Sequence, residues 1–384
     1  MTGSPAATTR PPRHVALDLG PLAASPTGVG AFCRGLLGAL RRREDVTVSG
    51  YAVALRSGAV RSLVEADLAL HTWPLPARLV NLLWQHGAVP SGELVARGWT
   101  GPPVDAVHGT NFVVPPCRRA AEIVTVHDLT AVHHRELCAP ASLAYPSLVR
   151  RAIGRGAFVH THSRWVAAEV VALLDAPADR VRAVPPGIEP RRSLGQLGSP
   201  PLRWPYLLAL GTVEPRKGYP TLVEAFGSFA REVPDVRLVI AGSDGWGSAA
   251  LEAALRSCPV RRRIVRRGYI ADDERDRMLA YAIALVYPSI YEGFGLPPLE
   301  AMAAGVPVVA SDGGALPEVL GKAALLVPVG DAAALAAALV RVVEDDGLRI
   351  GLVERGLAHA DAFGWDAAAA GMTALYNDAV EARG

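Results

Sequence analysis

Two kinds of apolar pattern alternate along almost the whole chain. Short runs rich in β-branched residues, typical of buried strands, are followed by longer segments in which apolar residues recur every three or four positions, as in amphipathic helices. This alternation predicts βαβ units around parallel sheets. In the first half we expect strands at 14–19, 46–53, 105–108, 122–127, 157–161 and 181–184, and helices at 29–43, 141–155 and 163–174. In the second half we expect strands at 206–210, 236–241, 263–268, 283–287, 307–310 and 324–327, and helices at 219–232, 248–256, 273–281, 297–304, 314–320, 331–345 and 366–381.

The two alternating series are separated by a segment with the composition of a linker, which follows Pro185-Pro186-Gly187. A chain of 384 residues is long enough for two domains with separate cores. We therefore expect an α/β protein with two Rossmann-like, doubly wound domains that face a cleft. The expected segments are a disordered tail at 1–13, an N-terminal domain at 14–188, a linker at 189–204, a C-terminal domain at 205–362, and a C-terminal helix at 363–384 that packs back toward the N-terminal domain.

Composition narrows the class of protein. No apolar run approaches the roughly 20 residues that a membrane-spanning helix needs, and the first twelve residues lack the apolar core of a secretion signal. The four cysteines are far apart and form no CxxC, so we expect reduced thiols, no metal site and a cytoplasmic protein. A net charge of +2 does not suit a dedicated nucleic-acid binder.

Charge is unevenly distributed along the chain, however. Residues 1–188 contain 19 basic and 13 acidic side chains, with arginine clusters at 41–43, 118–119 and 150–151. These clusters are either solvated helix ends or a surface attracted to an anionic lipid at the inner face of the cell membrane, and both interpretations stay open. Of the 39 basic residues, only Lys217 and Lys322 are lysines, which draws attention to Lys217.

The strongest candidate site is the segment YEGFGLPPLEAMAAG, which follows an apolar strand and ends in a helix with two prolines in its first turn. Its glycines allow the backbone to pass close to a ligand, and free amides at the helix start form an anion site. Glu292 on the loop and Glu300 on the helix suit hydrogen bonds to vicinal sugar hydroxyls. The competing interpretation is a simple turn in which Glu300 only favours the helix dipole. The loop residues are Gly293, Phe294, Gly295 and Leu296.

A second candidate, GTVEPRKG, directly follows the strand at 206–210. A strand that runs into a glycine-containing loop with two adjacent cations is a phosphate-binding arrangement. Arg216 and Lys217 would neutralise a diphosphate as a glycosidic bond breaks, without a metal ion. Gly211 and Thr212 open the same loop. An ordinary solvated pair of cations is the alternative.

Two weaker motifs lie in the first half. The string TGVG after the first strand is either a turn or a lid over a diphosphate. His127 and Asp128 end the buried strand VTVHDL, where side chains of a parallel sheet point into the ligand crevice. His127 would bind a donor hydroxyl or shield the anomeric centre, and Asp128 would orient His127 or hold the acceptor. A purely structural role for both is the alternative.

Together these strings resemble glycosyltransferase family 4, whose members have the two-domain GT-B fold and retain the anomeric configuration. The donor-domain resemblance extends from about 205 to 345 and rests on GTVEPRKG, on Gly268-Tyr269, on the EX7E motif from Glu292 to Glu300, and on LPEVLGKAALLVPVGD. In the first half, TGVG, VDAVHGTNF, VTVHDL and PPGI occur in the expected order. Thr27 stands where many relatives have another glycine, which leaves the contact of that loop open.

The resemblance implies a role for each of these residues. Arg216 and Lys217 would bind the pyrophosphate, Glu300 the ribose hydroxyls, and Glu292 the transferred sugar. The leaving phosphate itself would help to deprotonate the acceptor, so neither an enzymic nucleophile nor a cofactor is expected. The amides of Gly293, Phe294 and Gly295 would hold the sugar and β-phosphate, Gly268, Tyr269 and Ile270 would meet the base, Gly28, Gly30 and His127 would complete the donor site, and Asn111 and Asp128 would hold or orient the acceptor.

The predicted activity is transfer of a hexose from a nucleotide diphosphate sugar to a glycan, a glycolipid or a small molecule. VHGTNF, the HDL strand end and EPRKG are most similar to a subgroup that includes GDP-mannose-dependent mannosyltransferases, while glucose, N-acetylglucosamine and rhamnose stay open. A GT-B epimerase or phosphorylase and a non-catalytic sugar-nucleotide binder are the alternatives. The sequence lacks the GxGxxG and downstream acid of a nicotinamide enzyme.

Overall fold

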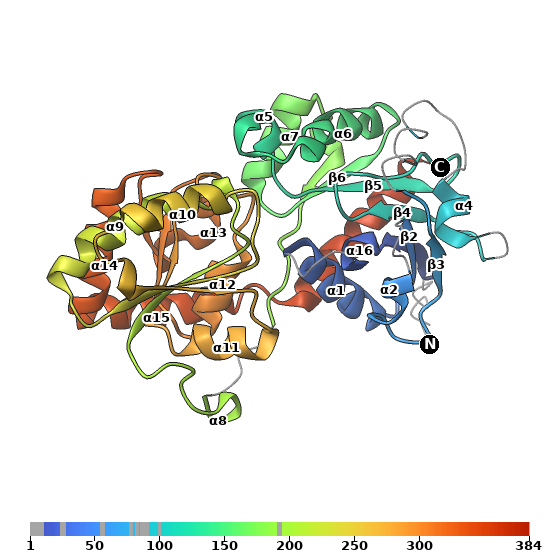
Figure 1. Ribbon diagram of the computed structural model, residues 1–384. Coiled ribbons are helices and arrows are strands. Elements are labelled where there is room, and N and C mark those ends of the chain that lie inside the picture. Colours follow the sequence, from blue (N-terminus) through green and yellow to red (C-terminus); the bar gives the residue numbers. More distant parts are fainter. Residues whose placement is uncertain are drawn as a thin grey trace, which may run out of the picture.

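The computed structural model describes residues 11–23, 28–53, 58–76, 80, 84, 92–98, 101–189 and 194–383. These residues form two lobes, each built around one parallel sheet (Figure 1). The predicted fold class of two Rossmann-like domains is confirmed. Of the expected tail, residues 1–10 lie outside the described residues, as do Thr27 of the TGVG string and residues 190–193 of the expected linker.

The N-terminal sheet has the strand order β3-β2-β1-β4-β5-β6-β7, so its order reverses between β1 and β4. Its strands are β1 (Arg13–Asp18), β2 (Val46–Val53), β3 (Leu70–Trp73), β4 (Ala106–Gly109), β5 (Ala121–Val126), β6 (Phe158–Thr161) and β7 (Val181–Ala183). The helices of this half are α1 (Gly28–Arg41), α2 (Gly58–Arg61), α4 (Gly92–Arg97), α5 (Thr130–His133), α6 (Tyr145–Gly154) and α7 (Arg164–Leu174).

The second sheet has the order β10-β9-β8-β11-β12-β13, which reverses between β8 and β11. Its strands are β8 (Tyr206–Leu210), β9 (Arg237–Ala241), β10 (Ile264–Gly268), β11 (Ala284–Tyr287), β12 (Val308–Ser311) and β13 (Leu325–Val327). The helices are α8 (Leu194–Leu197), α9 (Tyr219–Glu232), α10 (Ser248–Ser257), α11 (Asp272–Ala280), α12 (Leu296–Ala303), α13 (Leu316–Leu320), α14 (Ala332–Glu344), α15 (Asp346–Ala360) and α16 (Trp365–Glu381).

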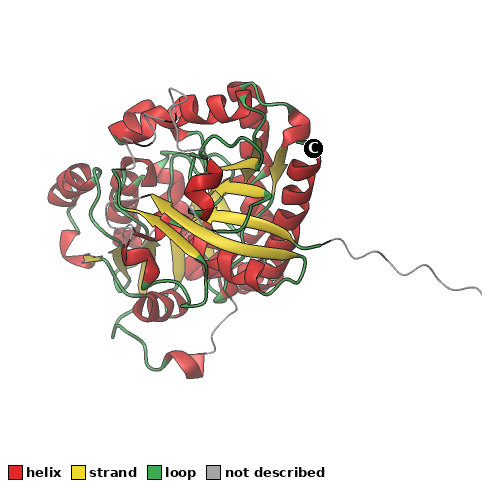
Figure 2. Ribbon diagram, turned by 90° about the vertical axis from the view of Figure 1, so that its right-hand side faces the viewer, coloured by secondary structure: helices red, strands yellow, loops and turns green. Residues whose placement is uncertain are grey.

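Helices cover both faces of each sheet, and Figure 2 shows the strands enclosed by them. Neighbouring residues of one strand therefore enter different cores, because successive side chains point to opposite faces. In β1, Val15 and Leu17 pack with α1, while Ala16 enters the core on the opposite face, to which α4 contributes Val95 and Ala96. In β8, Leu207 packs with α9 while Leu208 packs with α12. Burial on both faces explains why the strands appear in the sequence as continuous apolar runs.

The last helix, α16, returns to the first lobe (Figure 1), where Met372 and Tyr376 are buried in the core beside α1. The chain leaves the first sheet through Gly187, which lies against the start of this helix. A Cβ at Gly187 would come within 2.4 Å of the backbone nitrogen of Trp365. Because no other residue lacks a Cβ, the glycine of PPG is needed for the close approach of α16.

The structure contains elements that the apolar pattern missed. The edge strand β3 (LHTW) is short and has mixed polarity, so it has no clear period. Helix α15 contains three glycines, which weaken both its helix propensity and its apolar stripe. One of them, Gly356, allows α15 to approach Met302 of α12. The helix predicted at 141–155 begins only at Tyr145, and a 3₁₀ turn at Pro140–Ala144 replaces its first turn. Residue 13 of the expected tail already belongs to β1.

Candidate functional site

The candidate site lies where the carboxyl-end loops of the two sheets meet. Ser163, which follows β6, donates a hydrogen bond from Oγ to the Gly293 carbonyl oxygen at 2.8 Å. A Cβ at Gly293 would come within 1.8 Å of the His127 carbonyl oxygen, so the two domains touch here at backbone distance. The glycine expected to make room for a ligand makes room for the other domain. Gly295 instead has φ of 108° at the N-cap of α12, a conformation that favours glycine.

Three charged side chains from two loops of the second domain meet at the centre of the site. The loop after β8 provides Arg216 and Lys217, and the loop after β11 provides Glu292. Lys217 Nζ donates to Glu292 Oε1 at 2.6 Å, and an Arg216 N–H donates to Glu292 Oε2 at 2.8 Å. These loops leave the two strands between which the sheet order reverses. Ligands of open α/β sheets bind at such positions.

Two further residues complete this cluster. Tyr287 accepts a hydrogen bond from Lys217 Nζ at 2.7 Å and donates one to Glu292 Oε1 at 2.9 Å. Glu214 accepts from Arg216 Nε at 2.8 Å. Neither residue was predicted. Glu214 is visible in the string EPRKG, whereas Tyr287 is an ordinary last residue of a buried strand, and nothing in the sequence marks it.

The charges of this cluster depend on one another. Burial alone would raise the pKa of Glu292, but Arg216 and Lys217 outweigh burial and hold this pKa at about 2. Burial lowers the pKa of Lys217 below its ordinary value, although Glu292 acts in the opposite direction. Burial also opposes the charge of Arg216, but Glu292 and Asp128 raise the pKa of Arg216 well above its ordinary range. Lys217 is therefore a buried cation, only 8% exposed, with a carboxylate partner.

Further residues that the sequence predicts for the donor site also lie in the second domain. Burial raises the pKa of Glu300 on α12, and Arg275 of α11 lies 3.8 Å from its carboxylate. Gly268 has a left-handed φ of 64°, Tyr269 is 55% exposed and Ile270 is half-buried at the end of β10. Gly211, with φ of 144°, and Thr212 directly follow β8. Phe294 is buried, and Leu296 is the first residue of α12, whose N-terminus has no side-chain cap.

His127 is part of a buried histidine pair. Its Nε2 lies 2.9 Å from the Thr110 carbonyl oxygen, which can only accept, so Nε2 carries the proton. Burial lowers the pKa of His127 to about 4, so the ring is neutral and Nδ1 accepts from His162 Nε2 at 2.8 Å. Both ring nitrogens of His127 are thus occupied within the N-terminal domain. Asp128 does not orient this ring through a hydrogen bond, because both ring nitrogens have other partners and its carboxylate accepts from the Thr130 N–H.

The other N-terminal residues lie near the strands on either side of the sheet reversal. Gly28 opens α1 and has open space where a Cβ would stand, and Gly30 is buried in the same helix. Asn111 follows β4 and is half-buried, next to Phe112, which has a left-handed φ of 59°. A carboxylate that the sequence did not single out, Asp18, ends β1, and burial raises its pKa to about 6.

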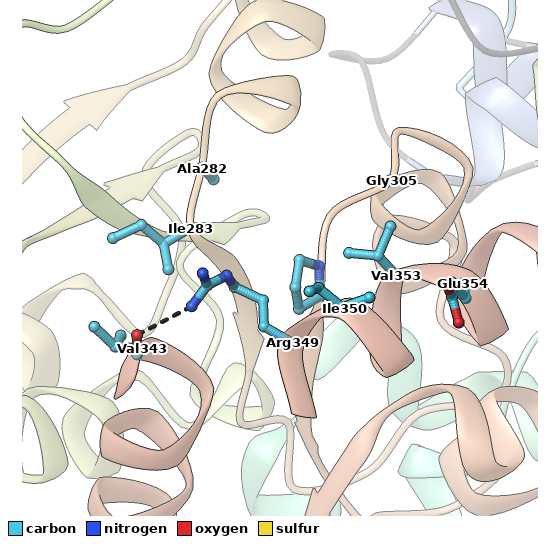
Figure 3. Close-up of a pocket in the computed structure, with 9 residues that line it drawn as sticks. Ala282, Ile283, Gly305, Val343, Arg349, Ile350, Val353 and Glu354 are labelled. Carbon is cyan, nitrogen blue, oxygen red and sulfur yellow. Dashed lines mark hydrogen bonds between the residues drawn. The ribbon is translucent and has the colours of Figure 1, made fainter. Parts of the chain in front are cut away.

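Of two cavities, one borders the cluster of Arg216, Lys217 and Glu292, and the other does not. One cavity of about 170 Å³ lies between the domains, and Arg216 forms part of its wall. A larger hollow of about 700 Å³ is lined by Ile283, Arg349 and Ile350 (Figure 3). It lies beside the amino end of β11, where Arg349 donates to the Val343 carbonyl. The larger hollow is therefore at the opposite end of the sheet from Lys217.

Comparison with known proteins assigns the family. The family described as "Glycosyl transferases group 1" matches residues 199–358. The O-antigen chain mannosyltransferase B of Escherichia coli is 32% identical over 269 residues, which cover 67% of this chain and 70% of that protein. The chain belongs to the group 1 glycosyltransferases. The D-inositol 3-phosphate glycosyltransferase of Acidothermus cellulolyticus is also 32% identical, over 67% of this chain but only 62% of its own length.

Solved structures support the fold of this glycosyltransferase. Sucrose-phosphate synthase from Thermosynechococcus elongatus superposes with a TM-score of 0.76 at 21% identity, over 96% of this chain and 100% of that one. WaaG, a glycosyltransferase involved in lipopolysaccharide biosynthesis, has a TM-score of 0.67 at 18% identity, over 90% and 95% of the two chains. At this identity the likeness concerns the fold alone, and it confirms the GT-B arrangement. The described part of the chain has no helix long and apolar enough to cross a membrane.

Proposed function

We propose that this protein is a retaining glycosyltransferase of family 4, which transfers a hexose from a nucleoside diphosphate sugar without a metal ion. The observation that carries the proposal is the cluster of Arg216, Lys217 and Glu292 at the reversal of strand order. Two cations fixed in a buried loop stabilise charge that develops on a leaving diphosphate. A bound divalent ion would serve the same purpose, so the cation pair makes it unnecessary.

In the proposed reaction, the acceptor hydroxyl oxygen forms a bond to the anomeric carbon while the bond from that carbon to the diphosphate oxygen breaks. The hydroxyl proton passes to the leaving phosphate on the same face. Lys217 and Arg216 offset the negative charge of that phosphate. Glu300, on α12, would accept hydrogen bonds from ribose hydroxyls, and Tyr269 offers an exposed ring to the base.

We favour mannose as the transferred sugar and GDP-mannose as the donor. The first support is the resemblance of VHGTNF, HDL and EPRKG to the mannosyltransferase subgroup. The second is the name of the Escherichia coli relative, a mannosyltransferase. Another relative, 27% identical over 74% of this chain, is named 2-deoxystreptamine glucosyltransferase, so glucose is the donor sugar to compare.

The test is incubation of the full chain with GDP-mannose, UDP-glucose, UDP-N-acetylglucosamine and dTDP-rhamnose, with release of the nucleoside diphosphate as the readout. We expect GDP-mannose to be consumed fastest, an α-linked product in the NMR spectrum, and unchanged turnover in EDTA. Loss of turnover in EDTA with recovery in magnesium would contradict metal independence, and a β-linked product would contradict retention.

We place the reaction in the cytoplasm. We also favour the interpretation that the arginine cluster at 41–43 is a solvated helix end and does not bind a membrane surface. Arg41 pairs with Asp67 at 2.7 Å, Arg42 with Asp366 at 2.7 Å, and Arg43 with Asp45 at 2.7 Å. Cations that already have carboxylate partners gain less from an anionic surface. Sedimentation with vesicles of anionic lipid would test this choice, since we expect no binding at physiological salt.

A further inference from the structure

The cavity between the domains has the size of a single ring. Its volume of about 170 Å³ is well below the roughly 300–1,000 Å³ of pockets for drug-sized ligands. Its wall comes mostly from the segment between β5 and α7, and the second domain adds three residues. Those three residues are Glu214, Arg216 and Trp246. Because Arg216 also binds Glu292, the cavity opens beside the predicted leaving phosphate.

Aromatic side chains line this cavity. Phe112 and Tyr145 are stacked, with ring centroids 4.6 Å apart and an angle of 5° between their planes. The backbone of Phe112 has a left-handed φ of 59°, which is unfavourable for a residue with a side chain. Unfavourable backbone conformations persist where the surrounding structure imposes them, often at ligand sites. Trp246 reaches over from the second domain and donates from Nε1 to the Leu137 carbonyl oxygen at 3.0 Å. This wall forms only when the domains meet.

Polar groups in the wall suit hydroxyls. Thr130 lines the cavity and is only 4% exposed, yet its Oγ1 has no hydrogen-bond partner among the described residues. Buried polar atoms in native structures normally have a partner, so this hydroxyl, which protein atoms cover, would gain a partner if a small shift of the wall brought it to a ligand hydroxyl. Asp128 and Ser142 also line the cavity and can bind hydroxyls.

The charges of the wall argue against a phosphorylated ligand. Of the residues that line the cavity, Arg216 is the one cation, and it is already hydrogen-bonded to Glu214 and Glu292. Asp128 and Glu214 add two carboxylates to the same wall. A phosphate placed here would meet more negative than positive charge, and the proposed donor diphosphate would already occupy Arg216.

We propose that this cavity binds the acceptor as one uncharged, hydroxylated six-membered ring, that Trp246 closes it, and that a phosphorylated ring is rejected. The proposal rests on the proposed function and adds the acceptor class. The Acidothermus cellulolyticus relative has a phosphorylated acceptor in its name, so this chain would differ from it in acceptor chemistry. The aromatic pair would face the apolar side of the ring, and Thr130 and Asp128 would bind its hydroxyls.

The test compares matched rings as acceptors for the full chain with its best donor. The probes are methyl α-mannoside, mannose 6-phosphate, myo-inositol and inositol 1-phosphate. We expect each neutral ring to be used at least about tenfold better than its phosphate, because unfavourable charge contacts cost several kcal/mol. Saturation-transfer NMR in the presence of the nucleoside diphosphate measures ring binding without turnover. Release of sugar to water, in the absence of an acceptor, reports separately on donor chemistry.

Variants connect this preference to the cavity. Thr130→Val should raise the acceptor KM about two- to tenfold, the range for one lost hydrogen bond, and leave the donor KM unchanged. Trp246→Ala should raise the acceptor KM about tenfold. The matched controls are Thr373→Val in α16 and Trp165→Ala, which removes an exposed indole that does not line the cavity and keeps the backbone N–H that binds Glu318. We expect both controls to behave like the natural protein.

Several results would overturn the proposal. These are a preference for the phosphorylated rings, binding of no neutral ring by NMR, and variants that change the donor KM but not the acceptor KM. Failure of the proposed function looks different. In that case no nucleotide sugar is hydrolysed or transferred, while the NMR measurement still reports whether the cavity binds a neutral ring.

Discussion

At the scale of single residues, Glu292 combines deep burial with close pairing to two cations. It is 6% exposed, and its carboxylate accepts from Lys217, Arg216 and Tyr287. A diphosphate that enters the site brings further negative charge to the same cations. We therefore expect the donor to share Lys217 and Arg216 with Glu292, and the loop that holds Glu292 to respond to donor binding.

Lys217→Ala should lower turnover by about a hundredfold or more, the scale seen when one preorganised electrostatic group is lost. Charge on the β-phosphate grows as the anomeric bond breaks, so turnover should fall more than the affinity for the nucleoside diphosphate. Initial rates and calorimetric titration measure the two effects. Lys217→Arg should rescue only part of the activity, because a planar fork does not fit the place of a compact ammonium. Near-normal turnover in a folded Lys217→Ala protein would exclude this role.

Glu300→Gln should weaken donor binding more than it slows the turnover of bound donor. Ribose contacts are nearly equal in the ground and transition states, so their loss appears in KM and not in kcat. The variant should also remove the ion pair between Arg275 and the Glu300 carboxylate, whose atoms lie 3.8 Å apart. Steady-state kinetics and donor titration decide the question. Unchanged donor affinity would mean that the ribose lies elsewhere.

At the scale of elements, a helix terminus of one domain is capped by the other. Glu318 of α13 accepts hydrogen bonds from the backbone N–H groups of Arg164 at 2.9 Å and Trp165 at 2.7 Å, which open α7. A carboxylate at a helix N-terminus satisfies free amides and favours the helix dipole. This contact, together with Ser163 and Gly293, holds the two carboxyl-end loops together.

Removing this cap by Glu318→Ala should therefore loosen the contact between the domains. The loss of a charged cap costs about 1 kcal/mol, which is enough to shift an open–closed equilibrium several-fold. We expect a larger radius of gyration in solution scattering and a several-fold lower kcat/KM, while each domain stays folded. Glu318→Gln keeps an acceptor oxygen and should show a smaller change. Scattering and kinetics equal to those of the natural protein would show that the cap does not control closure.

At the scale of the whole molecule, the N-terminal core contains a group of buried histidines. Tyr376 of α16 contacts His108, which contacts Thr125, and Thr125 contacts His160, each within 3.0 Å. Burial lowers the pKa of His127 and of His160 to about 4. Burial also lowers the pKa of His108 and of His162 well below the ordinary value. The folded domain therefore keeps all four rings neutral.

Stability should consequently fall as the pH is lowered from about 6.5 toward 4. In this range the imidazoles of the unfolded chain bind protons, whereas the buried imidazoles of the folded chain stay neutral. At pH 5, His127 and His160 therefore each lower the free energy of unfolding by about 1–2 kcal/mol. Asp18, whose pKa is raised to about 6, acts in the opposite direction, because folding favours its protonated form. The histidines outnumber it, so we expect a lower thermal midpoint at pH 5 than at pH 7.

The matched variant is Asp18→Asn, which removes the opposing carboxyl. Its thermal midpoint should fall more steeply between pH 7 and pH 5 than that of the natural protein. Differential scanning calorimetry at both pH values gives the comparison. Equal or higher stability at pH 5 would show that the buried rings accept protons without cost.

The sequence by itself determined the features that depend on local order along the chain. The alternation of apolar runs gave two parallel sheets, because both faces of such sheets are buried. The loops GTVEPRKG and YEGFG could be predicted as neighbours, since the carboxyl ends of parallel strands share one edge. Only the tertiary structure decided the partners of each charge. Whether Lys217 is free or paired depends on Glu292, 75 residues away, and whether Gly293 faces a ligand or His127 depends on domain contact. Burial and pairing are set by groups distant in the chain, and no local pattern records them.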